Sequence, residues 1–142
     1  MRKRLVKAPR LYWRDTGVLH ALLRLPPGDD LLAQPWAGAS WEGFVIEQIL
    51  TARAARGQGG DAYFFRSHDG YETDLVLESG RVREVIEIKL TSGPAPEDLA
   101  QLAQVGDLIN ATQLVLVCRV RKSLTTGRQW VTNLADYLRA SE

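Results

Sequence analysis

The sequence predicts an α/β domain with a central mixed β-sheet flanked by helices. Three strand-like runs in the middle of the chain are separated by short turn signals, a pattern typical of antiparallel hairpins. A helical segment then leads to a further apolar strand, and such a crossover indicates parallel pairing within the same sheet. The 142 residues, 45% hydrophobic and 25% charged, suit one folded globular domain.

Two helices are expected before the first strand. Asp15 is a capping-type residue, and apolar side chains follow it at helical spacing over residues 15–25, before Pro26 ends the segment. A longer helix is expected from about residue 39 to residue 55, where the glycine-rich stretch 56–60 closes it. We divide the chain into a basic N-terminal extension or linker, residues 1–10, and a single domain, residues 11–142.

The remaining elements are three strands, a helix, two strands and a short helix. The strands have alternating or continuous apolar runs bounded by turn residues, and the helix after the third strand opens at a proline-rich stretch. In chain order these elements are expected at residues 62–66, 72–78, 81–90, 97–109, 113–119, 129–132 and 134–139.

Charged residues fall on one face of the predicted hairpin 72–90. With a two-residue turn at Ser79-Gly80, Glu78 faces Arg81, and one face becomes almost wholly apolar, as the register requires. Asp74 and Glu87 then lie on the other face as diagonal neighbours, about 7 to 8 Å apart at the backbone and close enough for their carboxylates to share a cation. Lys89 is one step further along. A solvated sheet surface explains this face equally well.

Glu42 is out of place on the long helix. On a helical wheel it falls between Ile46 and Ile49, inside the apolar arc, whereas Glu47 falls on the polar side and is expected to be solvated. An unpaired carboxylate in an apolar contact costs several kcal/mol. Glu42 therefore needs a metal ion or a basic partner, unless the helix end lifts it into water.

Glu42 on a helix, Asp74 on a strand and Glu87-Ile-Lys89 on the next strand resemble the E…D…ExK order of the PD-(D/E)xK nucleases. The expected succession of elements also resembles the αβββαβ core of restriction endonucleases. The stretches KAPRLYWRDTG (7–17), GASWEGFVIE (38–47) and FFRSHDGYETD (64–74), with the ExK motif, resemble the uncharacterised C-terminal domain of many prokaryotic AAA-type ATPases.

The resemblance implies a restriction-endonuclease-like fold and a metal-dependent nuclease, a hydrolase acting on DNA phosphodiesters. Asp74 and Glu87 would hold Mg²⁺ or Mn²⁺, with Glu42 as a third ligand or an orienting residue, because Mg²⁺ prefers hard oxygen ligands. Lys89 would hold the attacking water or the phosphate as a point charge. Nearby Arg66 could meet the DNA backbone.

Two departures from the family pattern are visible. The chain contains no G-x-x-x-x-G-K-[ST] loop, so we expect no ATP site in it and an AAA-type ATPase module to be supplied in cis or in trans. Thr73 stands where the nuclease motif has proline. The alternative is therefore a catalytically silent module of the same fold that binds DNA or a partner for an AAA ATPase.

Other features favour structural roles. Five of the 18 basic residues lie in the first ten, where a solvated terminus is the simplest interpretation, and the net charge is only +1. Cys118 is expected in the core, Ser67-His68-Asp69 as a turn, and the tryptophans in core or interface contacts. Arg81 and Arg83 are expected as cross-strand partners of Glu78 and Glu72. No membrane span or signal is visible, so a cytoplasmic location is expected.

Overall fold

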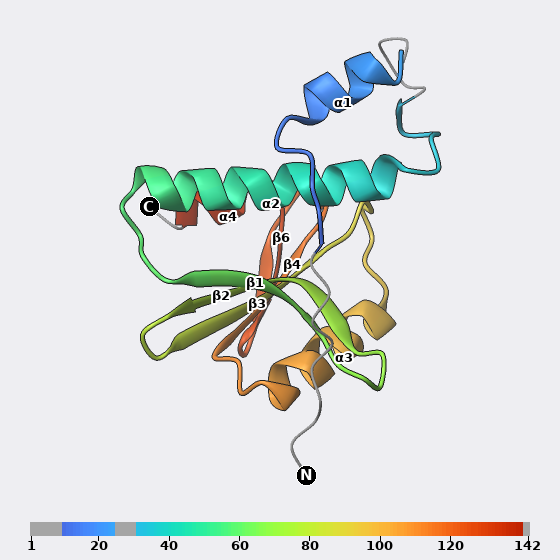
Figure 1. Cartoon of the computed structure of the whole chain (residues 1–142). Coiled ribbons are helices and arrows are strands. Elements are labelled where there is room, and N and C mark those ends of the chain that lie inside the picture. Colours follow the sequence, from blue (N-terminus) through green and yellow to red (C-terminus); the bar gives the residue numbers. More distant parts are fainter. Residues whose placement is uncertain (1–9, 25–30, 141–142) are drawn as a thin grey trace.

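The computed structural model describes residues 10–24 and 31–140. These residues form three layers, with a six-stranded sheet between helices α2 and α4 on one face and helix α3 on the other (Figure 1). The α/β class, the mixed sheet and the helices on both faces are confirmed. The elements are α1 (Thr16–Leu22), α2 (Ala37–Ala55), β1 (Asp61–Arg66), β2 (Glu72–Ser79), β3 (Val82–Ile88), α3 (Pro96–Leu108), β4 (Gln113–Val117), β5 (Leu124–Thr126), β6 (Gln129–Thr132) and α4 (Leu134–Ala140).

The strands lie in the order β1-β2-β3-β4-β6-β5. The first three pair antiparallel, as the hairpin signals predicted, and β4 pairs parallel to β3 because α3 carries the chain across the sheet. Strand β4 also pairs parallel to β6, and the segment that connects these two strands contains β5. Strand β5 was not expected. It is a three-residue edge strand, antiparallel to β6, whose residues are all exposed, so its sequence carries no burial pattern.

Alternation along the strands divides the core into two parts. Leu75, Leu77 and Ile86 pack with Val45 and Ile49 of α2 beneath the helix. On the opposite face, side chains of β2, β3 and β4 pack against Leu102 and Val105 of α3, among them Val76, Val85, Leu114 and Leu116. The central strands are apolar on both faces because helices cover both.

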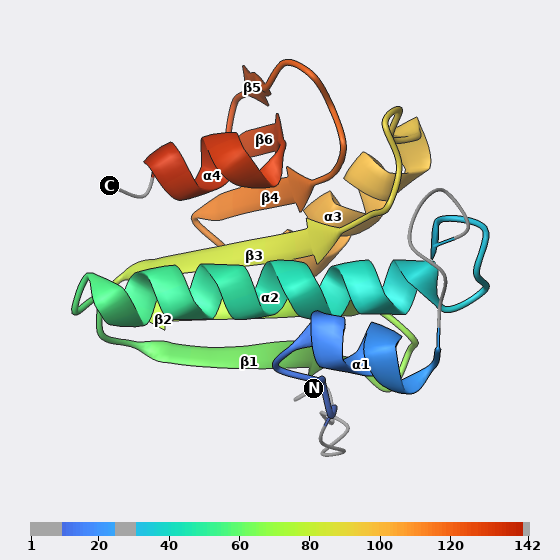
Figure 2. The same cartoon turned by 90° about the horizontal axis from the view of Figure 1, so that it is seen from above.

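Helix α1 differs from its prediction. Asp15 caps it, and its carboxylate accepts a hydrogen bond from the Val18 amide at 3.0 Å. The apolar residues that predicted the helix are nevertheless not part of a core, since no residue of α1 is buried. Leu22 is 65% exposed. The helix lies beside the N-terminal half of α2 (Figure 2), on the side of α2 that faces away from the sheet (Figure 1).

The hairpin register differs from the predicted one by two residues. Glu78 pairs with Arg83 and Ser79 with Val82, so the turn is Gly80-Arg81 and not Ser79-Gly80. Gly80 has a φ of 59°, a conformation that glycine adopts without steric cost. A shift of two keeps every side chain on its predicted face, but Arg81 leaves the ladder for the turn. Asp74 and Glu87 directly follow the pair Leu75–Ile86, so they face each other across the strands and are not the diagonal neighbours that were expected.

Two further sequence predictions concern Cys118 and membrane-spanning helices. Cys118 is buried in the core against α3, as expected for a core cysteine. Among the helices that the structure describes, none combines the length and apolar character needed to cross a membrane.

We predict that Gly106→Ala destabilises the fold. Gly106 is a buried residue of α3, and a Cβ at this position would overlap the Leu114 side chain of β4. Overpacking of this kind costs about 1–3 kcal/mol, more than the gain of up to about 1 kcal/mol from replacing a helical glycine. Urea denaturation would measure the loss.

Gly38→Ala in α2 is the matched control, because nothing lies within 4 Å of the Cβ it would add. It should leave the free energy of unfolding unchanged or raise it by at most about 1 kcal/mol. Equal effects of the two substitutions would contradict close packing of α3 on β4.

Candidate functional site

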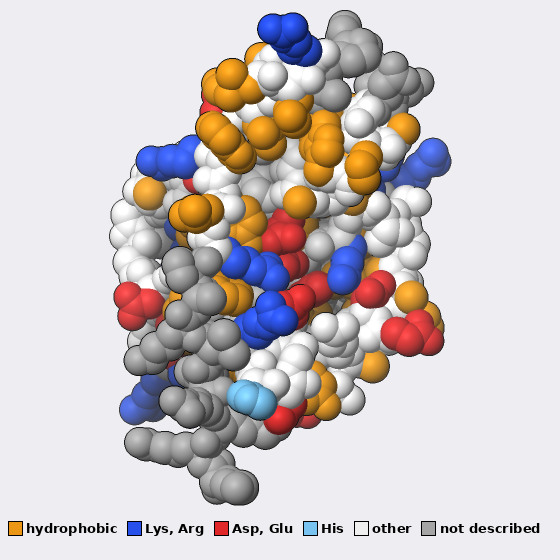
Figure 3. All heavy atoms as spheres, turned by 45° about the vertical axis from the view of Figure 1, so that its right-hand side comes forward, with side chains coloured by type: hydrophobic (Ala, Val, Ile, Leu, Met, Phe, Trp, Pro, Cys, Tyr) orange, Lys and Arg blue, Asp and Glu red, His pale blue; other side chains and the backbone are white. Residues whose placement is uncertain are grey.

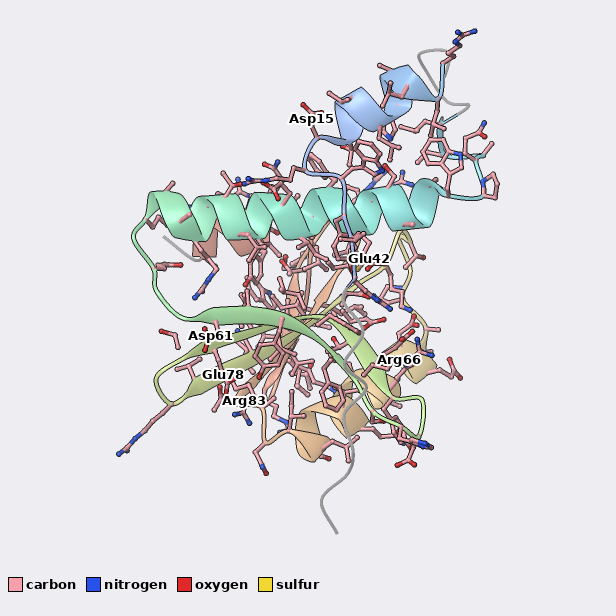
Figure 4. The ribbon with its side chains drawn as sticks, viewed as in Figure 1. Asp15, Glu42, Asp61, Arg66, Glu78 and Arg83 are labelled. Carbon is pink, nitrogen blue, oxygen red and sulfur yellow. The ribbon has the colours of Figure 1, made fainter. Side chains whose placement is uncertain are left out.

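The four sequence-predicted site residues come from three elements that meet at one end of the sheet. Glu42 lies in the N-terminal half of α2, and its side chain points from the helix toward the strands (Figure 4). Asp74 is the third residue of β2, and Glu87 is the last but one of β3. Lys89 follows β3, where its amide donates to the Val117 carbonyl at 3.0 Å.

An arginine from the N-terminal segment lies among these carboxylates. Arg10 Nη1 is 3.1 Å from Glu42 Oε1 and 3.3 Å from Asp74 Oδ1, and Nη2 is 3.3 Å from Glu72 Oε2. One guanidinium therefore joins α2 to β2. Of the three compensations expected for Glu42, the structure has the basic partner.

Two aromatic side chains hold Arg10 in this position. The Tyr12 hydroxyl donates to Glu42 Oε1 at 2.5 Å, and Arg10 Nη1 donates to the Tyr12 oxygen at 3.3 Å. Burial raises the pKa of Tyr12 to about 12, and the bond to Glu42 adds to the rise. The guanidinium carbon lies 5.0 Å from the centre of the Phe64 ring, within the range of a cation–π contact.

Asp74 is the most perturbed carboxyl of the site. Its side chain is 11% exposed. Burial, followed by the negative charges of Glu87 and Glu42, raises its pKa to about 7. The Ile88 amide, which donates to Asp74 Oδ2 at 2.8 Å, and the Arg10 charge act in the opposite direction.

A β-bulge lies at Asp74. Between the pairs Tyr63–Val76 and Phe65–Thr73, β1 has one residue, Phe64, whereas β2 has two, Asp74 and Leu75. Bulges of this kind bend a strand and change the direction of a side chain. The sequence signals gave no indication of it, because a bulge depends on the partner strand.

Glu87 and Lys89 form an ion pair, with Nζ 3.0 Å from Oε1. Lys89 Nζ also lies 4.0 Å from Asp98 of α3, a neighbour that the sequence did not indicate. Burial raises the pKa of Glu87, and its bond to Lys89 partly offsets the rise. Lys89 is desolvated, yet its pKa is raised because Glu87 and other carboxylates stabilise its charge.

Thr73, at the position of the motif proline, is 1% exposed. Its hydroxyl donates to the Ile86 carbonyl of β3 at 2.8 Å. The substitution thus adds a hydrogen bond between the two strands that carry Asp74 and Glu87. Proline has no hydroxyl to make this bond.

The carboxylates of the site are suitable ligands for a divalent cation, but a protein side chain, that of Arg10, lies between Glu42 and Asp74. Carboxylate oxygens are the ligands that Mg²⁺ and Mn²⁺ prefer. Within residues 10–24 and 31–140, no three His, Cys, Asp or Glu side chains are placed so that they could hold one metal ion. Glu42 and Asp74 instead converge on one nitrogen of Arg10.

Other charged residues have the following positions. Arg83 bonds Glu78 across the far end of the hairpin, whereas Arg81, the residue expected to face Glu78, lies in the turn. Arg83 and Glu78 are both distant from Glu42 in Figure 4. Arg66 Nε lies 3.8 Å from Glu72 at the margin of the site. Glu47, which was expected to be solvated, is 22% exposed and pairs with the exposed Arg14 at 3.1 Å.

The segment Ser67-His68-Asp69 is a turn, as expected. Tyr71 N donates to Ser67 Oγ at 3.1 Å, and the Gly70 amide donates to the Ser67 carbonyl at 3.2 Å. Trp36, Trp41 and Trp130 make ring contacts within the fold, whereas Trp13 is largely exposed. Trp130 stacks on Tyr137 in the core under α2, and Trp41 lies 5.9 Å from Phe44.

Arg10, Tyr12 and Asp98 are the site neighbours that sequence reasoning did not single out. Arg10 was assigned to the N-terminal extension, of which residues 1–9 lie outside the described part. It is separated by 32 and 64 residues from the carboxylates that it joins. No periodicity within one element reports contacts over such separations.

The chain belongs to the family described as a domain of unknown function, DUF4143, which matches residues 37–137. Over 96 residues, 66% of the chain, it is 42% identical to two proteins, the uncharacterised protein Rv2008c of Mycobacterium tuberculosis and the uncharacterised protein Mb2031c of Mycobacterium bovis. The matched part is 20% of each relative, so the chain spans about a fifth of the length of the relatives it matches. Glu42, Asp74, Glu87 and Lys89 all lie within the family region.

We predict that Asp74 makes folding less favourable as the pH rises. Its pKa moves from 3.8 to about 7, so between these values the folded chain retains a proton that the unfolded chain has lost. The stabilisation is complete below the lower value and is lost as the pH rises through the higher one. Relative to Asp74→Asn, the wild type should lose free energy of unfolding across this window, measured by urea denaturation.

Asp61→Asn is the control, because Asp61 is exposed at the start of β1, away from the site (Figure 4). Its unfolding free energy should follow that of the wild type at each pH. Parallel curves for wild type and Asp74→Asn would show that Asp74 is not buried beside other carboxylates.

Proposed function

We propose that this DUF4143 family member is a Mg²⁺- or Mn²⁺-dependent nuclease-like domain that hydrolyses DNA phosphodiesters. The observation that supports it most strongly is the convergence of Glu42, Asp74, Glu87 and Lys89. These residues are separated by up to 47 positions in the sequence, yet they lie at one end of the sheet and their charges act on one another.

The order of the elements also supports a restriction-endonuclease-like core. From α2 to β4 the succession is helix, three strands, helix, strand, as in the αβββαβ pattern expected from the motifs. The first three strands form an antiparallel meander, and the fourth joins β3 in parallel. Asp74 and Glu87 lie on adjacent strands of this core.

The carboxylates supply the chemistry that a cation needs. Asp74 and Glu87 would be ligands, and Glu42 a third ligand or a residue that orients bound water. When bound, Mg²⁺ polarises the phosphate and lowers the pKa of the attacking water. The Ile88 amide holds the Asp74 carboxylate in place through its 2.8 Å hydrogen bond.

Lys89 would act on the water or the scissile phosphate. Its ammonium is a compact charge with three donors, and pairing with Glu87 keeps it protonated and oriented at the edge of the cluster. With a side chain 38% exposed, Lys89 is also accessible to a substrate. A positive charge beside a phosphate stabilises the negative charge that develops in the transition state.

DNA as substrate is supported by local charge and not by the overall charge of +1. In the space-filling view, acidic side chains gather near the middle of one face, with basic side chains on both sides of them (Figure 3). Arg66, 54% exposed at the margin of the site, is one basic residue able to meet a phosphate.

We further propose that the domain works with an AAA-type ATPase module. The family motifs in the sequence imply it, and the matched relatives are about five times as long as the region they share with this chain. Their remaining length provides room for such a module. In this arrangement the ATPase would act in cis or in trans on the DNA that the domain cuts.

The direct test is cleavage of plasmid and single-stranded DNA in Mg²⁺ or Mn²⁺, with Glu87→Ala and Lys89→Ala beside the wild type. Each substitution should lower the rate by at least about a hundredfold, because it removes a ligand or a transition-state charge. Asp61→Asn, an exposed carboxylate far from the site, should retain the wild-type rate.

Cleavage that survives both Glu87→Ala and Lys89→Ala would refute the site assignment. Circular dichroism of each variant should match the wild type, since both side chains lie outside the two hydrophobic cores. Chelation of the cation should abolish DNA cleavage by the wild type, and adding Mg²⁺ or Mn²⁺ back in excess should restore the cleavage.

A catalytically silent module that binds DNA or a partner for the ATPase is the second candidate. The observation that favours it is the Arg10 guanidinium, which already balances Glu42 and Asp74. In such a module the carboxylates and Arg10 would be structural. The expected result is then neither DNA cleavage nor stabilisation of the fold by Mg²⁺ or Mn²⁺ in a thermal melt.

A further inference from the structure

Arg10 lies where a metal ion would have to lie in order to bind Glu42 and Asp74 together. Its Nη1 contacts one oxygen of each, at 3.1 and 3.3 Å. Two carboxylates that converge on one positive nitrogen present the same charge pattern to a divalent cation. A guanidinium and a cation cannot occupy this position together.

The contacts of Arg10 are those of a bound ion and not of a loose surface pair. The guanidinium reaches three carboxylates, those of Glu42, Glu72 and Asp74, and its side chain is 29% exposed. Hydrogen bonds in which both groups are charged are roughly twice as strong as neutral ones. Arg10 therefore neutralises part of the acidic cluster in the absence of metal.

The segment that carries Arg10 is held mainly by side chains. We call residues 10–13 the arm. Among the described residues, no backbone hydrogen bond of the arm joins it to a helix or a strand. Leu11 is 94% exposed and Trp13 55% exposed, so Arg10 and Tyr12 provide its contacts with the site.

Space for movement adjoins the arm. A cavity of about 510 Å³ lies between the arm, α1 and α2, and its lining includes Arg10, Tyr12 and Glu42. The guanidinium could leave the carboxylates without displacing either hydrophobic core, because neither core contains Arg10. Opening of the whole arm also requires Tyr12 to leave its packing against the core beneath α2, a contact that favours the closed arm.

We propose that Arg10 is a built-in occupant of the cation position, and that a divalent cation binds Glu42 and Asp74 only after the arm has withdrawn Arg10. The inference rests on the cation site of the proposed function and adds its regulation. Any interaction that pulls the arm away would favour cation binding. By linkage, a bound cation would hold the arm open.

The test compares Mn²⁺ binding by the full 142-residue chain in four forms, measured by isothermal titration calorimetry. If the arm is open in about a tenth of the molecules, Arg10→Gln should bind Mn²⁺ about tenfold more tightly than the wild type. Tyr12→Phe, which loses the bond to Glu42 but changes no charge, should tighten binding by a smaller factor.

Arg66→Gln is the matched control, since it removes the same charge from the margin of the cluster, 3.8 Å from Glu72. It should change Mn²⁺ affinity by less than about twofold, as expected of a partly exposed charge. If Arg66→Gln and Arg10→Gln tighten binding equally, the effect is general electrostatics and the proposal is overturned. No tightening in Arg10→Gln also overturns it.

Arm opening has a separate readout in the wild type. Trypsin cleaves after arginine, so Mn²⁺ should accelerate cleavage after Arg10, detected by intact mass spectrometry. Mn²⁺ binding with unchanged cleavage at Arg10 would show that cation and guanidinium coexist. If circular dichroism shows that Arg10→Gln is unfolded, the proposal is tested by the Mn²⁺ affinity of Tyr12→Phe and by trypsin cleavage of the wild type after Arg10.

The outcomes also separate this inference from the proposed nuclease activity. Mn²⁺ affinities in the expected order without DNA cleavage by any variant would reject the nuclease and leave the exchange of Arg10 for cation in place. No Mn²⁺ binding by any form would overturn both.

Discussion

The pairing of β2 with β3 is the constraint on which the rest of the structure depends. Val76 opposite Val85 and Leu75 opposite Ile86 send alternate side chains into the cores on the two faces of the sheet. A slip of one residue would exchange the faces and bury charges under both helices. The same pairing brings Asp74 beside Glu87. The site is therefore a consequence of the register that builds the core.

Bringing these acids together has an electrostatic cost. Asp74 and Glu87 are both nearly buried, and each lies within the field of Glu42, so burial and mutual repulsion favour their protonated forms. The fold compensates with basic groups from outside the hairpin strands, Arg10 on one side and Lys89 on the other. A cation in the same place would supply equivalent compensation. Stability of the fold and the proposed chemistry therefore both require a positive charge beside Asp74 and Glu87.

Several features depended on contacts that a single element does not reveal. The turn is Gly80-Arg81, one residue later than the predicted Ser79-Gly80 turn of the same length. The resulting shift of two residues in the pairing leaves Asp74 and Glu87 on their predicted common face. Helix α1 was predicted correctly at its Asp15 cap, but its apolar residues are exposed. Strand β5 exists only as a partner of β6.

The sequence by itself determined the order of helices and strands apart from β5, the apolar face of the hairpin, and the misplaced carboxylate at Glu42. These follow from periodicity and composition, which act over a few residues. Only the tertiary structure decided the bulge at Asp74 and the partner of Glu42. Arg10, the partner of Glu42, is 32 residues away in the sequence, and an ion pair between such distant segments depends on how the whole chain is folded.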